Sequence, residues 1–106
     1  MVFVIGSEFG RTPGYNSGNG KDHWSVSSMM FMGRGIKGGR ILGSSTHRHS
    51  AKKINATTLD NDDNGIEIIY AHINKALRKL AGIESNKLIT QYYPLSGEIE
   101  DLNLFV

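Results

Sequence analysis

The sequence of 106 residues has no cysteine, little net charge and no long apolar run. Without cysteine, the chain forms no disulfide, holds no thiolate-bound metal and has no cysteine nucleophile. No segment approaches the roughly 18 apolar residues that a membrane-spanning helix needs, so we expect no membrane span. The net charge of +2 is too small to favour nucleic acid as a partner.

The start of the sequence also lacks the features of a signal peptide. Residues 1–5 are apolar, but this run is too short and has no positively charged lead. A sequence that opens directly with an apolar strand is typical of a chain cut within a domain. We therefore expect residues 1–106 to be a single partial domain.

Apolar segments and one helical pattern indicate the fold. Residues 2–5 are apolar without alternation, which predicts a strand buried on both faces, as in a parallel sheet under helices. The second half of residues 24–32 and the short segment 40–43 are further predicted strands. Near the end of the chain, three apolar residues are expected to dock on the body: Leu102, Leu104 and Phe105.

The clearest predicted element is an amphipathic helix over residues 65–81. Its apolar residues recur at spacings of three and four: Ile66, Ile69, Ile73, Leu77 and Leu80. Acidic and capping residues precede it (Asp62, Asp63 and Asn64), cations lie near its end (Lys75, Arg78 and Lys79), and Gly82 follows as a stop. His72 lies beside the stripe and is predicted to be a surface or boundary residue rather than a ligand.

Polar residues gather directly after the first predicted strand. Glu8 and Arg11 come first, and Asp22 and His23 follow a loop rich in glycine and asparagine. Carboxylate and imidazole groups bind divalent metals, and an arginine suits phosphate or sulfate. The alternative is a scaffold, in which Glu8 forms a salt bridge with Arg11 and His23 packs under Trp24. Both interpretations stay open on the residues alone.

Two other segments have a structural and a functional interpretation. The glycine-rich residues 33–39 suit turns between strands. The functional alternative is a loop that cradles a phosphate, but these residues match neither the dinucleotide fingerprint nor the P-loop. The basic run contains His47, Arg48, His49, Lys52 and Lys53. Such a run is typical of a solvated loop, although it could also contact a metal or phosphate.

A series of motifs resembles a known family. The run 7–13 (Ser-Glu-Phe-Gly-Arg-Thr-Pro) is followed by Asn16, Gly20, the triplet Asp22-His23-Trp24, the glycines of residues 33–39, and Gly43. This order resembles the C-terminal part of a bacterial family of exported, sulfatase-like proteins of unknown function, many of which carry a twin-arginine signal. That family is similar to the alkaline phosphatase superfamily. The resemblance implies that residues 1–106 are the C-terminal portion of a larger α/β hydrolase-like domain. They would form a fragment of an alkaline-phosphatase-like α/β sandwich, with a few strands and one main amphipathic helix.

The resemblance also implies roles for individual residues. Glu8 matches an acidic metal ligand at a strand end, and His23 matches a later histidine ligand, with Asp22 as a further candidate. Arg11 would contact the anion. The metal would be zinc, manganese or calcium, and the ligand a phosphate or sulfate ester. Phe9 departs from the superfamily, which commonly has a second histidine ligand there.

The same resemblance limits what this chain is expected to do alone. In the superfamily, the nucleophile and the first metal ligands precede the part matched here. We therefore expect a metallohydrolase fragment or remnant that is inactive alone. The alternative is a small anion- or partner-binding module using Arg11, His23 and the basic run from His47 to Lys53, and an independent oligomeric hydrolase is a third hypothesis. Relatives are exported to the bacterial envelope or periplasm, and self-association through an exposed strand edge is expected.

Overall fold

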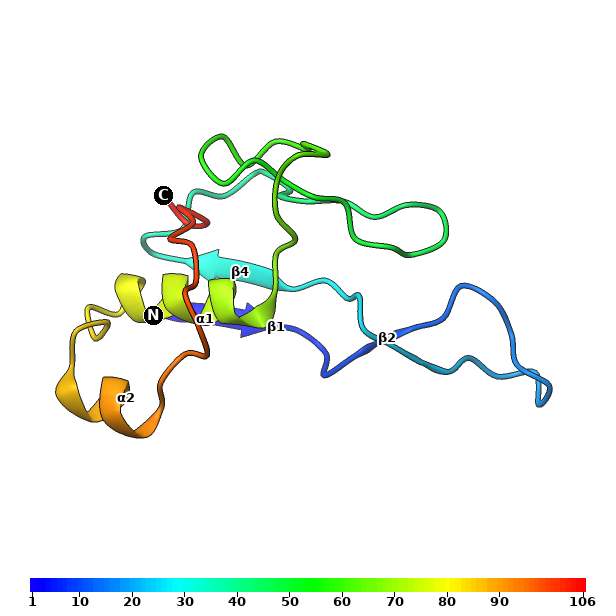
Figure 1. Ribbon diagram of the computed structural model, residues 1–106, viewed down its shortest axis with the longest axis horizontal. Coiled ribbons are helices and arrows are strands. Elements are labelled where there is room, and N and C mark those ends of the chain that lie inside the picture. The colour runs from blue at the N-terminus through cyan, green and yellow to red at the C-terminus, as the bar shows by residue number, and fades with distance from the viewer.

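The computed structural model describes residues 1–106 and contains two small antiparallel sheets and two helices (Figure 1). One sheet pairs β1 (Val2–Ile5) with β4 (Met30–Gly33), and the other pairs β2 (Gly10–Arg11) with β3 (His23–Trp24). The helices are α1 (Tyr70–Leu80) and α2 (Lys87–Tyr92). The predicted α/β class is confirmed. Neither helix combines the length and apolar character needed to cross a membrane.

The first strand lies where it was predicted, but its surroundings differ. β1 runs antiparallel to β4, and Phe3, Val4 and Ile5 are 52%, 42% and 56% exposed. The predicted parallel strand buried on both faces is therefore wrong. The physical reason is the connection, because residues 6–29 lead back to β4 as a long hairpin rather than through a covering helix.

Residues 40–43 are not a strand, contrary to the prediction. The guanidinium of Arg40 instead donates to the carbonyl oxygens of Lys37 and Leu104, at 3.2 and 2.8 Å. These contacts fix the segment through a side chain rather than through strand pairing. As a result, Ile41 remains 93% exposed.

The main helix begins later than the apolar spacing predicted. Ile66 exchanges two backbone hydrogen bonds of 2.8 Å with Ile54, so the chain is still extended there. Asp62 accepts from the N–H of Asn64 and forms a turn instead of a helix cap. Because the bridge to Ile54 uses the backbone that a first helical turn would need, α1 starts only at Tyr70.

The predicted end of this helix is confirmed. Gly82 has a φ of +71°, and its N–H donates to the carbonyl of Lys79. The next N–H, of Ile83, reaches back to the carbonyl of Arg78. This pair of bonds is a Schellman motif, which requires the left-handed conformation that glycine adopts at no steric cost.

The core is small and is completed by the C-terminal tail. Six apolar residues are buried: Ile54, Leu59, Ala76, Leu102, Leu104 and Phe105. The prediction that the tail docks on the body is thus confirmed. Of the predicted apolar stripe, Ile69 is half exposed because it caps α1, while the other four residues pack against the core. The short α2 was not predicted, and its cap is the side chain of Asn86.

Candidate functional site

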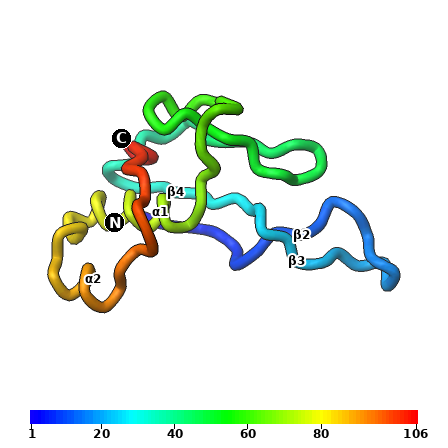
Figure 2. Tube along the Cα trace, viewed as in Figure 1, coloured from blue at the N-terminus to red at the C-terminus, as the bar shows by residue number.

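Three predicted site residues, Arg11, Asp22 and His23, lie on the hairpin formed by β2 and β3, which extends away from the core (Figure 2). The fourth, Glu8, lies just before β2. Asn16 orders the connecting loop, since its side-chain oxygen accepts from the N–H groups of Gly18 and Gly20, both at 3.0 Å. Its amide group donates to a carboxylate oxygen of Asp22 at 2.9 Å. The loop therefore has a defined internal structure, and Asp22 is part of it.

Arg11 and His23 face each other across the hairpin. They are directly opposed in the β2–β3 register, which places their side chains on the same face. The ring of His23 stacks on Phe9, with centroids 3.8 Å apart and an angle of 23°. The Arg11 guanidinium donates to the carbonyl of Lys21 at 3.0 Å and lies 5.1 Å from the centre of the Phe9 ring. Phe9 thus holds both groups in place.

The salt bridge considered between Glu8 and Arg11 is not formed. The ion pairs of the protein are His72–Glu100 and Lys79–Asp101, so Glu8 makes none with Arg11. Instead, the backbone of Ser7 and Glu8 is held by α1, because the Tyr70 hydroxyl lies 3.2 and 3.4 Å from their two carbonyl oxygens. The Glu8 side chain stays exposed.

The candidate metal ligands do not form a complete site. No group of three or more histidine, cysteine, aspartate or glutamate side chains lies close enough to hold a metal ion. Of the predicted ligands, Glu8 and His23 are exposed, and Asp22 is engaged by Asn16. A mononuclear metal centre normally takes at least three protein ligands. The donor set therefore does not fit a metal on its own, and the predicted metal site stays a prediction.

The turn that carries the basic run is fixed against the hairpin. The Trp24 ring N–H donates to the carbonyl of His49 at 2.7 Å, and His49 Nδ1 lies 3.3 Å from the carbonyl oxygen of Arg11. Neither contact was predictable from the sequence, because the partners are 25 and 38 residues apart. The structure thus brings the basic run next to Arg11.

The lysines of this run line a groove of mixed charge. The groove has a volume of about 560 Å³ and is lined by Thr46, Ala51, Lys52, Lys53, Asn61, Asp63 and Glu67. Two carboxylates therefore lie beside the two lysines. This balance disfavours the groove as a strong anion site, since the acidic groups oppose an anion that the lysines would attract.

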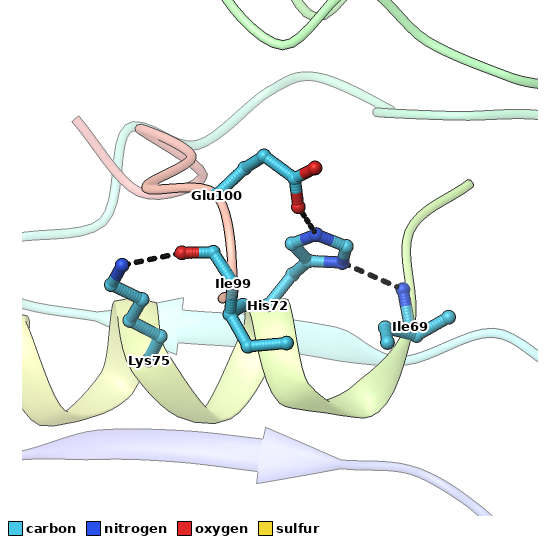
Figure 3. A network of polar contacts seen from close by, with 5 residues as sticks. All are labelled: Ile69, His72, Lys75, Ile99 and Glu100. Carbon is cyan, nitrogen blue, oxygen red and sulfur yellow. Dashed lines mark hydrogen bonds and ion pairs between the residues drawn. The ribbon is translucent and has the colours of Figure 1, made fainter. Parts of the chain in front are cut away.

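A second polar cluster surrounds His72 on α1 (Figure 3). Its Nδ1 accepts from the N–H of Ile69 at 3.1 Å, and its Nε2 lies 2.7 Å from Glu100 in the tail. Because Nδ1 is an acceptor, the proton sits on Nε2 and is donated to the carboxylate. His72 is only 4% exposed, so its prediction as a surface or boundary residue is wrong. The tail covers it, and both ring nitrogens have structural partners.

The tail is attached to α1 by this cluster and by two lysines. Lys75 donates to the carbonyl of Ile99, and Lys79 pairs with Asp101 at 2.9 Å. The hydrogen bond with Asp101 raises the pKa of Lys79. The hydrogen bond from His72 lowers the pKa of Glu100, with further lowering by a backbone N–H and by the charge of Lys75. The contacts of Glu100 therefore favour the ionised form of its carboxylate.

We expect stability to fall in acid through Glu100. A pKa below the ordinary 4.5 means that the folded state favours the carboxylate, so the stabilisation is present above pH 4.5 and is lost as the pH falls through the folded-state pKa. Urea midpoints measured from about pH 6 to about pH 3 should drop less for Glu100→Gln than for the unmodified chain. Glu98→Gln is the control, because Glu98 lies two residues before Glu100 in the same tail but has no such partner. An equal drop in all three proteins would contradict the role of Glu100.

The fold and the hairpin define a small α/β protein with an exposed carboxylate, arginine and histidine on one hairpin. The chain belongs to the family described as Protein of unknown function (DUF1501), whose model matches residues 1–91. The matched region includes all the predicted site residues and ends before the tail that completes the core. No curated protein and no solved structure matches the chain.

Proposed function

We propose that this chain is a C-terminal fragment or remnant of a sulfatase-like, alkaline-phosphatase-like metallohydrolase and is inactive alone. In this role Glu8 and His23 would be two of the metal ligands, with Asp22 as a further candidate, and Arg11 would contact the phosphate or sulfate ester. A guanidinium suits this task because its planar donors match a tetrahedral anion in two places.

The observation that carries this proposal is the register of the β2–β3 hairpin. It sets Arg11 opposite His23, and both side chains are exposed to an incoming ligand. Glu8 lies just before β2 and is also exposed. The missing third ligand is consistent with a site that is completed by groups outside these 106 residues. Glu8, Asp22 and His23 do not by themselves define a catalytic step.

Zinc binding tests this proposal. Calorimetry should show weak binding by the unmodified chain and at least about tenfold weaker binding by His23→Ala and by Glu8→Gln. His47→Ala is the matched control, because His47 is an exposed histidine outside the hairpin. Equal binding by the unmodified chain and His23→Ala would rule out the ligand role. Turnover of a phosphate or sulfate ester that Glu8→Gln abolishes would show that the chain is active alone.

The second candidate function is a small anion- or partner-binding module. It is favoured by the contacts of His49 with Trp24 and Arg11, which bring the basic run beside the hairpin. The mixed charge of the neighbouring groove argues against it. Repeating the titration with sulfate instead of zinc separates the two candidates, because only the module should bind sulfate through Arg11 and Lys52 without a metal.

A further inference from the structure

The first turn of α1 contacts both the C-terminal tail and the segment that carries Glu8. On one side, the Nε2 atom of His72 donates to Glu100 in the tail at 2.7 Å (Figure 3). On another side, the Tyr70 hydroxyl lies 3.2 and 3.4 Å from the carbonyl oxygens of Ser7 and Glu8. Residues two apart on a helix are separated by roughly 200° around its axis. One helical turn therefore lies between the tail and the candidate site.

The start of α1 depends on His72. The helix follows Ile69, whose apolar side chain cannot accept a hydrogen bond from the free N–H groups of the first turn. His72 Nδ1 accepts from the N–H of Ile69 at 3.1 Å, the role that Glu or Gln has in a capping box. Glu100 holds the other ring nitrogen and so fixes the ring in the orientation that this bond needs. The tail therefore helps to set where the helix begins, and with it the position of Tyr70.

The segment around Glu8 is linked to the helix by Tyr70. The Ser7 hydroxyl donates to the carbonyl of Phe9 at 3.1 Å, which closes a short turn around Glu8. This bond joins residues only two apart, so it does not place the turn relative to α1. The Tyr70 hydroxyl supplies that link, because Tyr70 lies 62 residues after Glu8 in the sequence.

We propose that Tyr70 is a positioning residue for Glu8, and that the tail acts on this position through Glu100 and His72. The inference rests on the proposed function, in which Glu8 is a metal ligand. Groups that orient a ligand change the metal affinity when they are removed. Tyr70 and His72 lie within the residues that the family model matches, whereas Glu100 lies beyond them. The tail thus adds a contact from outside the matched region to a site inside it.

Amide signals in nuclear magnetic resonance spectra test both links. Tyr70→Phe removes only the hydroxyl, and Glu100→Ala removes the carboxylate that His72 contacts. Each substitution should shift the amide signals of Glu8 and Phe9. These two N–H groups belong to the same planar peptide units as the carbonyl groups that the Tyr70 hydroxyl contacts. Circular dichroism checks that each variant folds.

Matched variants serve as controls. Tyr92→Phe removes a hydroxyl from a side chain that is 65% exposed on α2, and Glu98→Ala removes a carboxylate from the same tail. Both should leave the signals of Glu8 and Phe9 in place. An unmoved Glu8 signal in Tyr70→Phe or in Glu100→Ala would overturn the proposal.

The double variant separates coupling from two independent effects. If the tail acts through Tyr70, Glu100→Ala should cause no further shift at Glu8 once Tyr70→Phe is present. Shifts that simply add would overturn the proposal, because the tail would then act on Glu8 by another route.

Zinc affinity tests whether this positioning serves the metal. Tyr70→Phe should weaken zinc binding by about threefold to tenfold, as expected for the loss of one hydrogen bond, and Glu100→Ala should act in the same direction. Unchanged affinity in Tyr70→Phe would overturn the positioning role even if the amide signals shift. If the unmodified chain binds no zinc, the proposed function fails, whereas the amide signals still decide whether Tyr70 and the tail fix Glu8.

Discussion

Replacement of Ile54 by alanine is expected to lower the free energy of unfolding by about 2–5 kcal/mol. Ile54 is the one fully buried large side chain, at 0% exposed, and it belongs to a core of only six apolar residues. Its backbone also pairs with Ile66 and so sets the path of the chain into α1.

The measurement is urea unfolding followed by circular dichroism, at one fixed protein concentration because self-association would couple to stability. Ile41→Ala is the matched control, since it removes the same atoms from a side chain that is 93% exposed. It should change stability by less than about 0.5 kcal/mol. If both substitutions cost the same, the packing described around Ile54 is wrong.

Features that depend on neighbours in the sequence were predicted well. The β-branched run gave the strand at Val2–Ile5, and Gly82 gave the end of α1. The apolar residues Leu102, Leu104 and Phe105 were expected to dock, and all three are buried. In each case the side-chain chemistry or the backbone freedom of a few consecutive residues decides the outcome.

Features that depend on distant partners were not predicted. The spacing of Ile66 and Ile69 continues the helical pattern, yet the bridge from Ile66 to Ile54 holds that segment extended. His72 was placed at the surface because nothing near it in sequence showed that Glu100 would cover it. The burial of β1 was overestimated because an apolar run does not reveal whether other elements cover both faces of the strand.

The candidate site shows the same division. Arg11, Asp22 and His23 lie within one short stretch, so a hairpin brings them together, and the glycines and asparagines of the loop indicated a turn. The stacking of Phe9 on His23 was not predicted. It gives Phe9 a structural role, because its ring orients the histidine.

Replacement of Gly10 by alanine is expected to disrupt this site without touching any of its polar groups. A Cβ atom at Gly10 would overlap the carbonyl oxygen of Val26. The position of a Cβ atom is fixed by the backbone, and the oxygen is itself a backbone atom, so neither can turn aside. β2 must therefore move away from the chain that follows β3 at Val26. The cost should be about 1–3 kcal/mol or more, as for overpacked sites. Since the register sets Arg11 opposite His23, we expect the two side chains to separate.

Gly14→Ala is the matched control, because it lies in the same hairpin and its added Cβ would have nothing within 4 Å. Amide hydrogen exchange across residues 10–24 should accelerate in Gly10→Ala and stay unchanged in Gly14→Ala. If Glu8 and His23 act together on a metal, zinc binding should fall in Gly10→Ala as far as in His23→Ala. Normal exchange with lost zinc binding would contradict the positioning role of the hairpin. The hairpin would then be intact, so its register could not be what positions His23.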